Sequence, residues 1–134
     1  YKNGDIKASG LYVNELKDST WYYYDKDSVL VMTEQYNKGL LNGMTKTYYQ
    51  TGEIYEIKSW KMGKMDGLCN LFFSNGQLMM ESYYINNIKE KNCIYYYPSG
   101  IISHKGNYIS GIKSGKWEYF NDEGVIDTII NYNE

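Results

Sequence analysis

The sequence lacks arginine altogether, and it contains only one alanine, Ala8, and one proline, Pro98. Without arginine the chain has no side chain suited to bidentate phosphate recognition, and its net charge of −2 provides no basic stripe for nucleic acid. The scarcity of alanine disfavours helices. We therefore predict that the protein has no nucleic-acid partner and is not helical.

Long apolar runs are also missing. No stretch approaches the about 20 apolar residues that a membrane-spanning helix needs. Lysines and acids are interspersed, so no polybasic patch is available for anionic lipid, and a membrane partner is disfavoured. No signal peptide is visible, but the chain begins at Tyr1 in mid-pattern. We therefore expect that an upstream signal or domain precedes it.

The residues that carry chemistry are too few for a recognisable catalytic or metal site. His104 is the only histidine, whereas a catalytic triad or a typical zinc site needs partners. No C-x₂-C pair, phosphate-binding loop before a helix or cofactor fingerprint occurs. We predict a non-enzymatic protein with no cofactor and no metal, in which His104 is a partly buried strand residue.

The two cysteines, Cys69 and Cys93, lie 24 residues apart. In the repeat structure that we derive next, equivalent positions lie about 10 Å apart, since two strand spacings separate them. A disulfide requires Cα atoms within about 7 Å. We predict free thiols that act as small apolar side chains, which favours a reducing, cytoplasmic compartment, although an upstream signal would leave the compartment open.

Aromatic residues and glycines are abundant instead, with 17 tyrosines, three tryptophans, three phenylalanines and 13 glycines, and they recur every 24 residues. The first column holds Gly4, Ser28, Gly52, Gly76, Gly100 and Gly124. Eight residues later an aromatic column holds Tyr12, Tyr36, Trp60, Tyr84, Tyr108 and Tyr132. The period predicts one repeat domain over 1–134, with units 4–27, 28–51, 52–75, 76–99 and 100–123 and a partial unit 124–134.

Each unit is predicted to form two strands. In the third unit, 53–61 is the first strand, 62–67 a glycine-bounded turn, 68–73 the second strand and 74–76 a short turn. A three-residue connection that ends in glycine suits a type I turn closed by a left-handed residue. This register places Phe72 opposite Leu78 and Tyr96 opposite Ile102. Where Ser28 and Glu15 replace glycine, we expect local distortion or a different turn type.

Several segments resemble the Y-x-x-G-x-x-x-G hallmark of MORN repeats, namely Tyr36–Gly43, Trp60–Gly67 and Tyr108–Gly115. The continuation GKWEYFNDEGVI is similar to the bacterial MORN-variant subfamily. Two units depart from the hallmark: Tyr12–Ser19 lacks both glycines, and Tyr84–Lys91 has asparagine and lysine in their place. These departures put the local turn geometry in question.

The resemblance implies an all-β fold, an elongated and twisted single antiparallel sheet of tandem hairpins. It also implies a non-enzymatic scaffold or binding module. Some bacterial members are antitoxins of toxin–antitoxin pairs, and eukaryotic relatives are linked to membrane association and protein assembly.

A candidate partner-binding surface follows from the columns that vary between repeats. Aromatic side chains in these columns face away from the column of Tyr48, Phe72 and Tyr96, because successive strand residues alternate between faces. The candidates are Tyr49, Phe73, Tyr97, Tyr95, Tyr119 and Trp117. Tyrosine and tryptophan are enriched at interaction hot spots. The alternative is that these rings form the other half of a two-sided sheet or pack on a further domain.

Three functions remain open from the sequence. The first is a protein-binding module, with a cognate toxin as a specific partner in an antitoxin or immunity-like role. The second is a cell-wall or carbohydrate binder, because STWYYYDKDSVL resembles choline-binding repeats. Against it, tryptophan fills its column only at Trp21 and Trp117. The third is a membrane-surface scaffold. The unpaired end strands of an open sheet also predict an edge-strand homodimer.

Overall fold

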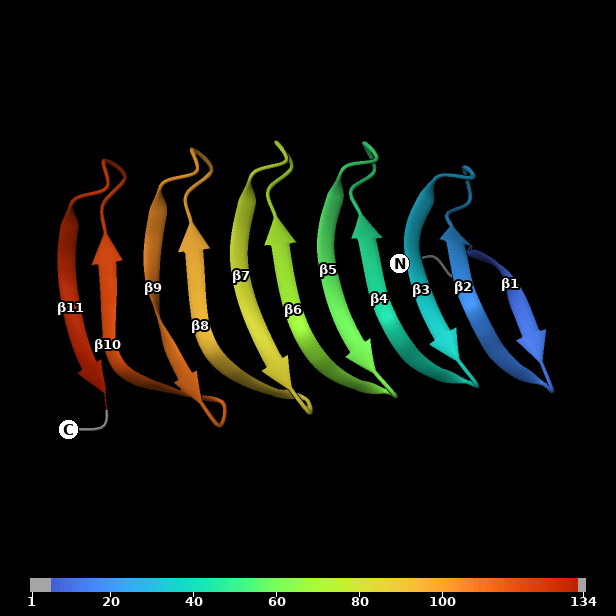
Figure 1. The fold of residues 1–134 in the computed structure, drawn as a ribbon. Helices are drawn as coiled ribbons and strands as arrows, with labels where there is room; N and C mark the ends of the chain where they lie inside the picture. Colours follow the sequence, from blue (N-terminus) through green and yellow to red (C-terminus); the bar gives the residue numbers. More distant parts are fainter. Residues whose placement is uncertain (1–5, 133–134) are drawn as a thin grey trace.

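The computed structural model describes residues 6–132, which form one antiparallel sheet of eleven strands in sequence order (Figure 1). The strands are β1 (Lys7–Val13), β2 (Leu16–Tyr24), β3 (Leu30–Asn37), β4 (Leu40–Tyr48), β5 (Ile54–Lys61), β6 (Lys64–Phe72), β7 (Leu78–Ile85), β8 (Ile88–Tyr96), β9 (Ile102–Ile109), β10 (Ile112–Phe120) and β11 (Ile126–Tyr132). The predicted all-β fold is confirmed. β1 and β11 form the two edges, and the edge-strand homodimer stays a prediction.

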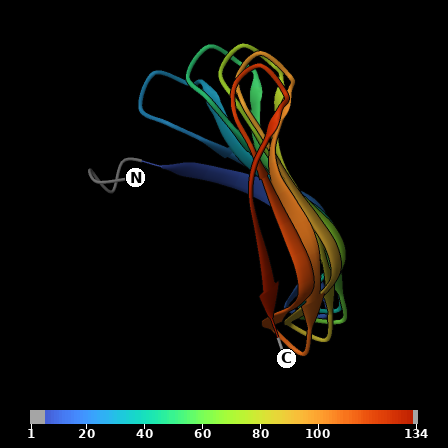
Figure 2. The same cartoon turned by 90° about the vertical axis from the view of Figure 1, so that its left-hand side faces the viewer.

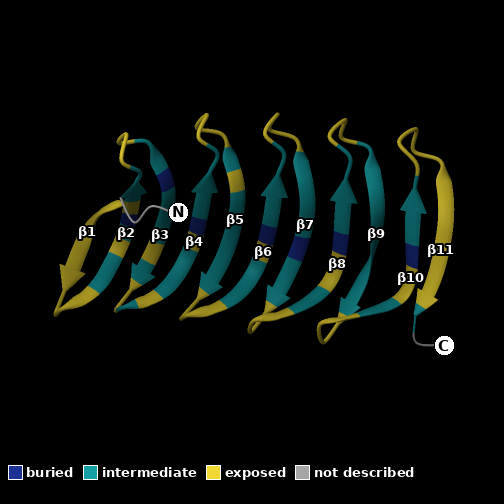
Figure 3. Cartoon of the chain, turned by 180° about the vertical axis from the view of Figure 1, so that it is seen from behind, coloured by how far each residue is buried: buried dark blue, intermediate teal, exposed yellow. Residues whose placement is uncertain are grey.

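The sheet is a single curved layer (Figure 2). Its core is a thin band across the middle of the strands (Figure 3). The buried residues are Trp21, Val31, Thr45, Cys69, Ser82, Cys93 and Trp117. Because residues 6–132 form no second layer over either face, apolar area is buried mainly between side chains of neighbouring strands.

The three-residue turns between repeats have the predicted geometry. The Gly52 N–H donates to the Tyr49 carbonyl at 2.9 Å, and the Tyr49 N–H donates to the Glu53 carbonyl at 2.8 Å. Gly52 has a φ of +95°, so a left-handed residue closes a tight turn. Gly76, Gly100 and Gly124 repeat this arrangement, while Gly4 lies outside the described residues.

The turn at Ser28 is of the same type, so the expectation of a different turn there is wrong. Ser28 has a φ of +62°, and its N–H donates to the Asp25 carbonyl at 3.0 Å. The Asp25 carboxylate also accepts from the N–H groups of Asp27 and Val29, at 2.9 and 3.0 Å. These two side-chain bonds hold the turn and offset the cost of a left-handed serine.

The predicted cross-strand register is confirmed. Phe72 pairs with Leu78, and Tyr96 pairs with Ile102. In the strand pairs β6–β7 and β8–β9 the register shifts by one residue just before the pair that flanks the turn, as expected for a bulge at that position.

The turn predicted at 62–67 is too long. β5 ends at Lys61 and β6 begins at Lys64, so the turn consists of Met62 and Gly63 alone, with φ values of +47° and +85°. Two consecutive positive φ values identify a type I′ hairpin turn. Gly67, the second glycine of the hallmark, lies inside β6 with a φ of +109°, beside the point where the β5–β6 register shifts. It therefore belongs to a bulge and not to the turn.

The two units that lack hallmark glycines keep the same backbone. Glu15 and Ser19 have φ values of +66° and +62°, and Asn87 and Lys91 have values of +71° and +64°. The expected distortion at Glu15 is therefore absent. At Asn87 the side-chain Oδ1 accepts from the Met65 N–H at 2.8 Å, which stabilises the turn from the preceding hairpin.

Hydrogen bonds between successive two-residue turns join each hairpin to the next. The Gly63 N–H donates to the Leu41 carbonyl at 2.7 Å, and the Met62 N–H donates to the Asn42 side chain at 3.0 Å. Equivalent backbone bonds run from Gly39 to Lys17, from Asn87 to Met65 and from Gly111 to Lys89. The repeats are thus fixed at their ends as well as along their strands.

Candidate partner-binding faces

The alternation of side chains divides the sheet into two faces. We call the first the aromatic face; it carries Trp21, Tyr23, Tyr36, Tyr95, His104, Tyr108, Trp117 and Tyr119. We call the second the groove face; it carries Thr20, Tyr22, Met44, Lys46, Leu68, Asn92, Ile94, Lys105, Asn107, Lys116 and Glu118.

Trp117 lies on β10 of the aromatic face, next to the edge strand β11, and its side chain is fully buried, at 0% exposure. Its ring lies on Gly106, where any added Cβ would overlap the indole. Its Nε1 donates to the Asn107 carbonyl at 3.1 Å, and the Tyr108 ring meets it edge-on at 5.3 Å. Trp117 is one of the predicted contact residues, and its side chain is buried in the sheet against Gly106.

Trp21 forms the same arrangement 96 residues earlier. Its ring lies on Gly10, its Nε1 donates to the Leu11 carbonyl at 3.1 Å, and Tyr12 meets it edge-on at 4.9 Å. The two tryptophans thus belong to two copies of one packing unit, which explains why each is accompanied by glycine on the adjacent strand.

His104 lies between two parallel rings on the aromatic face. Its ring stacks on Tyr95 at 4.1 Å and on Tyr119 at 5.3 Å. Burial, and then the positive charge of Lys113, lower the pKa of His104 below its usual value. The prediction of a partly buried strand residue is confirmed, and Tyr95 and Tyr119 are occupied by this stack.

The remaining predicted contact residues lie at the three-residue turns and are half-buried. The Tyr49 hydroxyl donates to the Phe72 carbonyl, and the Tyr97 hydroxyl donates to the Phe120 carbonyl, both at 2.7 Å. Phe73 has no hydroxyl and cannot make this bond. Tyr49 and Tyr97 therefore hold successive repeats together, whatever further contact they make.

Lysines of the chain itself occupy the ring faces of the aromatic face. Lys17 Nζ lies 4.6 Å from the Trp21 ring centre, and Lys113 Nζ lies 4.7 Å from that of Trp117. A choline-binding site would offer these faces to a quaternary ammonium group. Since the cation positions are already filled, the arrangement disfavours the choline-binding alternative.

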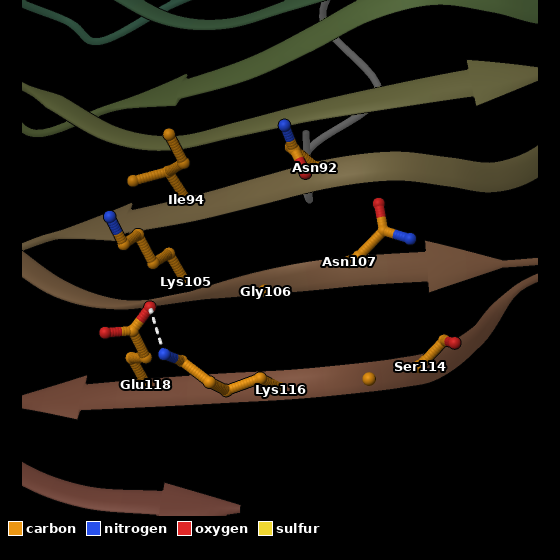
Figure 4. A pocket seen from close by; sticks show the side chains of 9 residues that line it. Asn92, Ile94, Lys105, Gly106, Asn107, Ser114, Lys116 and Glu118 are labelled. Atoms are coloured by element: carbon orange, nitrogen blue, oxygen red, sulfur yellow. Dashed lines mark ion pairs between the residues drawn. The ribbon is translucent and has the colours of Figure 1, made fainter. Parts of the chain in front are cut away.

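The groove face differs because it leaves large apolar side chains in solvent and is hollowed between them. Tyr22, Met44 and Leu68 are 41%, 46% and 54% exposed. Described residues of this face line open hollows of about 240, 310 and 390 Å³, and Figure 4 shows the one of about 390 Å³, between β8 and β10.

Sequence reasoning missed the groove face, although a signal for it was present. The column that contains Met44 and Leu68 also contains Thr20, Asn92 and Lys116, so it varies in every complete repeat. Such variation indicates a position that the repeat architecture does not determine.

Other chemistry is scarce in the described part of the chain. Cys69 and Cys93 are free and buried, as predicted, and burial raises the pKa of both thiols. Over residues 6–132 no group of three potential metal ligands gathers, and no helix has the length and apolarity to cross a membrane.

A family model described as the MORN repeat variant matches residues 41–62 and 65–86. No curated protein matches the chain. MORN repeats are non-catalytic modules that generally mediate protein or membrane interactions. The matched segments cover two adjacent repeats of a sheet whose other hairpins share their turns and register. Residues 41–86 therefore match the MORN repeat variant, and the strands on either side of them continue the same sheet of tandem hairpins.

Proposed function

We propose that the protein is a non-enzymatic module that binds a protein partner on the groove face. The observation that carries this proposal is the exposure of Met44 and Leu68 at equivalent positions of neighbouring repeats. Exposed apolar side chains that neighbour polar groups are typical of interaction surfaces. The aromatic face offers less free surface for a partner, because its rings pack on Gly106, stack on His104 or are covered by the chain's own lysines.

The rim of two-residue turns extends the groove face with aliphatic side chains. Ile85, Ile88, Ile109 and Ile112 flank two adjacent turns, and all four are exposed. Together with Leu68 they provide the apolar area that the centre of a protein interface requires.

The bacterial resemblance adds a specific form of this partner, a toxin encoded beside the gene. The test is co-purification of that neighbouring product with the chain, followed by calorimetry on the complex. Leu68→Ser and Met44→Ser should weaken binding at least tenfold, since exposed apolar contacts are removed without loss of buried packing.

The control variants lie at the predicted turn positions. Phe73→Ala and Tyr97→Phe change the other candidate surface and should leave the affinity within twofold. If Phe73→Ala and Tyr97→Phe weaken the complex and the groove variants do not, the binding surface is the one first predicted from the sequence. If no variant changes the affinity, the proposal of a groove-face interface fails.

The four exposed turn isoleucines also favour a second candidate, a membrane-surface scaffold, because exposed aliphatic side chains can enter the lipid interface. Flotation with vesicles of phosphatidylcholine and phosphatidylserine tests it. Binding that is lost in Ile109→Ser/Ile112→Ser would support this function, and no flotation at any lipid composition would dismiss it.

A further inference from the structure

The three hollows of the groove face are equivalent sites of the repeat. Each is formed by the second strand of one hairpin, the strand that follows and the second strand of the next hairpin. The first is lined by Tyr22, Thr33, Gln35 and Met44, the second by Leu68, Glu81, Tyr83 and Asn92, and the third by Asn92, Lys105, Asn107 and Lys116. The second and third hollows share the wall of Asn92 and Ile94, so they form one continuous groove from β6 to β10.

The spacing of the hollows restricts what can fill them. Successive hairpins are two strands apart, which corresponds to about 10 Å across the sheet. The second and third hollows are therefore about 10 Å apart, and the first lies four strands from the second, or about 20 Å away. A polypeptide that crosses the strands must present side chains at multiples of about 10 Å. A polyproline II segment rises about 3.1 Å per residue, so every third residue recurs at about 9.3 Å. A two-residue strand step of about 6.7 Å does not match. Side chains on one face of an α-helix recur every seven residues, at about 10.5 Å, but a helix uses its backbone groups in internal hydrogen bonds and leaves none for the polar walls of the groove.

The walls of the groove suit a backbone that has no internal hydrogen bonds. Asn92 and Asn107 stand on adjacent strands of the third hollow, which Gly106 also lines (Figure 4). A polyproline II backbone leaves its carbonyl groups free, and amide side chains can donate to them. Leu68 and Ile94 provide apolar surface between these polar groups.

The charge of the groove is opposite to that of the chain. Lys46, Lys91, Lys105 and Lys116 line the three hollows, against Glu81 and Glu118, so the lining has a net charge of +2, while the whole chain has −2.

Both carboxylates already have partners. Glu118 pairs with Lys116 at 4.0 Å, and Glu81 accepts from the Tyr96 hydroxyl at 2.6 Å. Burial, and then this hydrogen bond, raise the pKa of Tyr96 to about 12, so the hydroxyl keeps its proton. Within residues 6–132, Lys46, Lys91 and Lys105 have no carboxylate within ion-pair distance, which favours an acidic partner.

We propose that the groove face binds an acidic partner segment in the polyproline II conformation, which runs across the strands and fills the hollows with side chains spaced by multiples of three residues. This inference rests on the proposed protein-binding function and specifies its partner.

The test uses the full chain and fluorescein-labelled synthetic peptides, with affinities measured by fluorescence anisotropy. The first peptide repeats Leu-Pro-Glu four times. A second has the same composition with leucine spaced irregularly, and a third has lysine in place of glutamate. The first should bind at least tenfold more tightly than either control. Equal affinities for the regular and irregular peptides would overturn the inference.

Charge reversal on the protein guards against effects of misfolding. Lys105→Glu should lower the affinity for the glutamate peptide and raise the affinity for the lysine peptide. Lys38→Glu, in a turn outside the groove, should change neither affinity. If both variants prefer the glutamate peptide over the lysine peptide to the same extent, the proposed site is contradicted. If Leu68→Ser weakens the natural partner but no peptide shows a dependence on spacing, the protein-binding function stands and the polyproline II inference fails. If Leu68→Ser leaves the natural partner unaffected, the groove-face function itself fails.

Discussion

The two tryptophan hairpins, β1–β2 and β9–β10, are built from the same residues and yet differ in their surroundings. In each, tryptophan lies on a glycine, donates to a backbone carbonyl and accepts a lysine over its ring. In the first hairpin Tyr12 is 59% exposed on an edge strand, while in the second Tyr108 is half-buried between neighbours. The local packing is set by the sequence of one hairpin, whereas burial is set by its place in the stack.

The largest expected effect comes from removing the tryptophans. Trp117→Ala should lower the free energy of unfolding by about 3 to 5 kcal/mol, because a buried ring is replaced by a cavity. Trp21→Ala should cost less, since β1 is an edge strand that can shift toward the space. Urea unfolding followed by circular dichroism measures both. Equal losses would show that position in the stack does not matter.

The glycines beneath the rings should give the next effect. Gly106→Ala places a Cβ where the Trp117 indole lies, and overpacking of this kind costs about 1 to 3 kcal/mol. Gly10→Ala should lower the free energy of unfolding by less, because Gly10 lies on the edge strand β1, which can move away from the Trp21 ring. The double variant Gly106→Ala/Trp117→Val should be more stable than the sum of its single changes predicts. If the changes in the free energy of unfolding of the two single variants are strictly additive in the double variant, the contact between Gly106 and Trp117 is contradicted.

The repeat and its register could be predicted from the sequence because the period of 24 residues never slips. The length of the Met62–Gly63 turn could not, because Gly67 looks like a turn boundary but serves a bulge within β6. The burial of Trp117 was also missed. Alternation assigns a side chain to a face, but only the neighbouring Gly106 and Tyr108 determine how deeply it lies.

A pH dependence should distinguish the two tryptophan hairpins. His104, which stacks between Tyr95 and Tyr119, lies near Trp117 with the ring centres 6.5 Å apart. Ala8 occupies the equivalent position in the first hairpin. The folded-state pKa of His104 is lowered, so the unfolded chain takes up a proton first as the pH falls. Stability is therefore full above the unfolded value of about 6.5 and decreases as the pH falls toward the folded value. His104→Gln should reduce this decrease between pH 7 and 5; an identical pH profile would contradict the role of the stack.

The smallest effects should come from the three-residue turns. Gly100→Ala should destabilise by about 1 kcal/mol, because an L-residue is forced into a left-handed conformation. Ser28→Gly should change stability by less, since relief of strain is offset by greater freedom of the unfolded chain. Thermal unfolding by calorimetry resolves the two. A neutral Gly100→Ala would show that the turn tolerates any residue.

The central claim is that the aromatic face holds the sheet together while the groove face receives the partner. Hydroxyl-radical footprinting of the purified complex, read by mass spectrometry, tests it most directly. We expect the partner to protect Met44 and Leu68 from oxidation and to leave Tyr95, Tyr119 and Phe73 as reactive as in the free chain. Protection of the three rings with Met44 and Leu68 unchanged would contradict it.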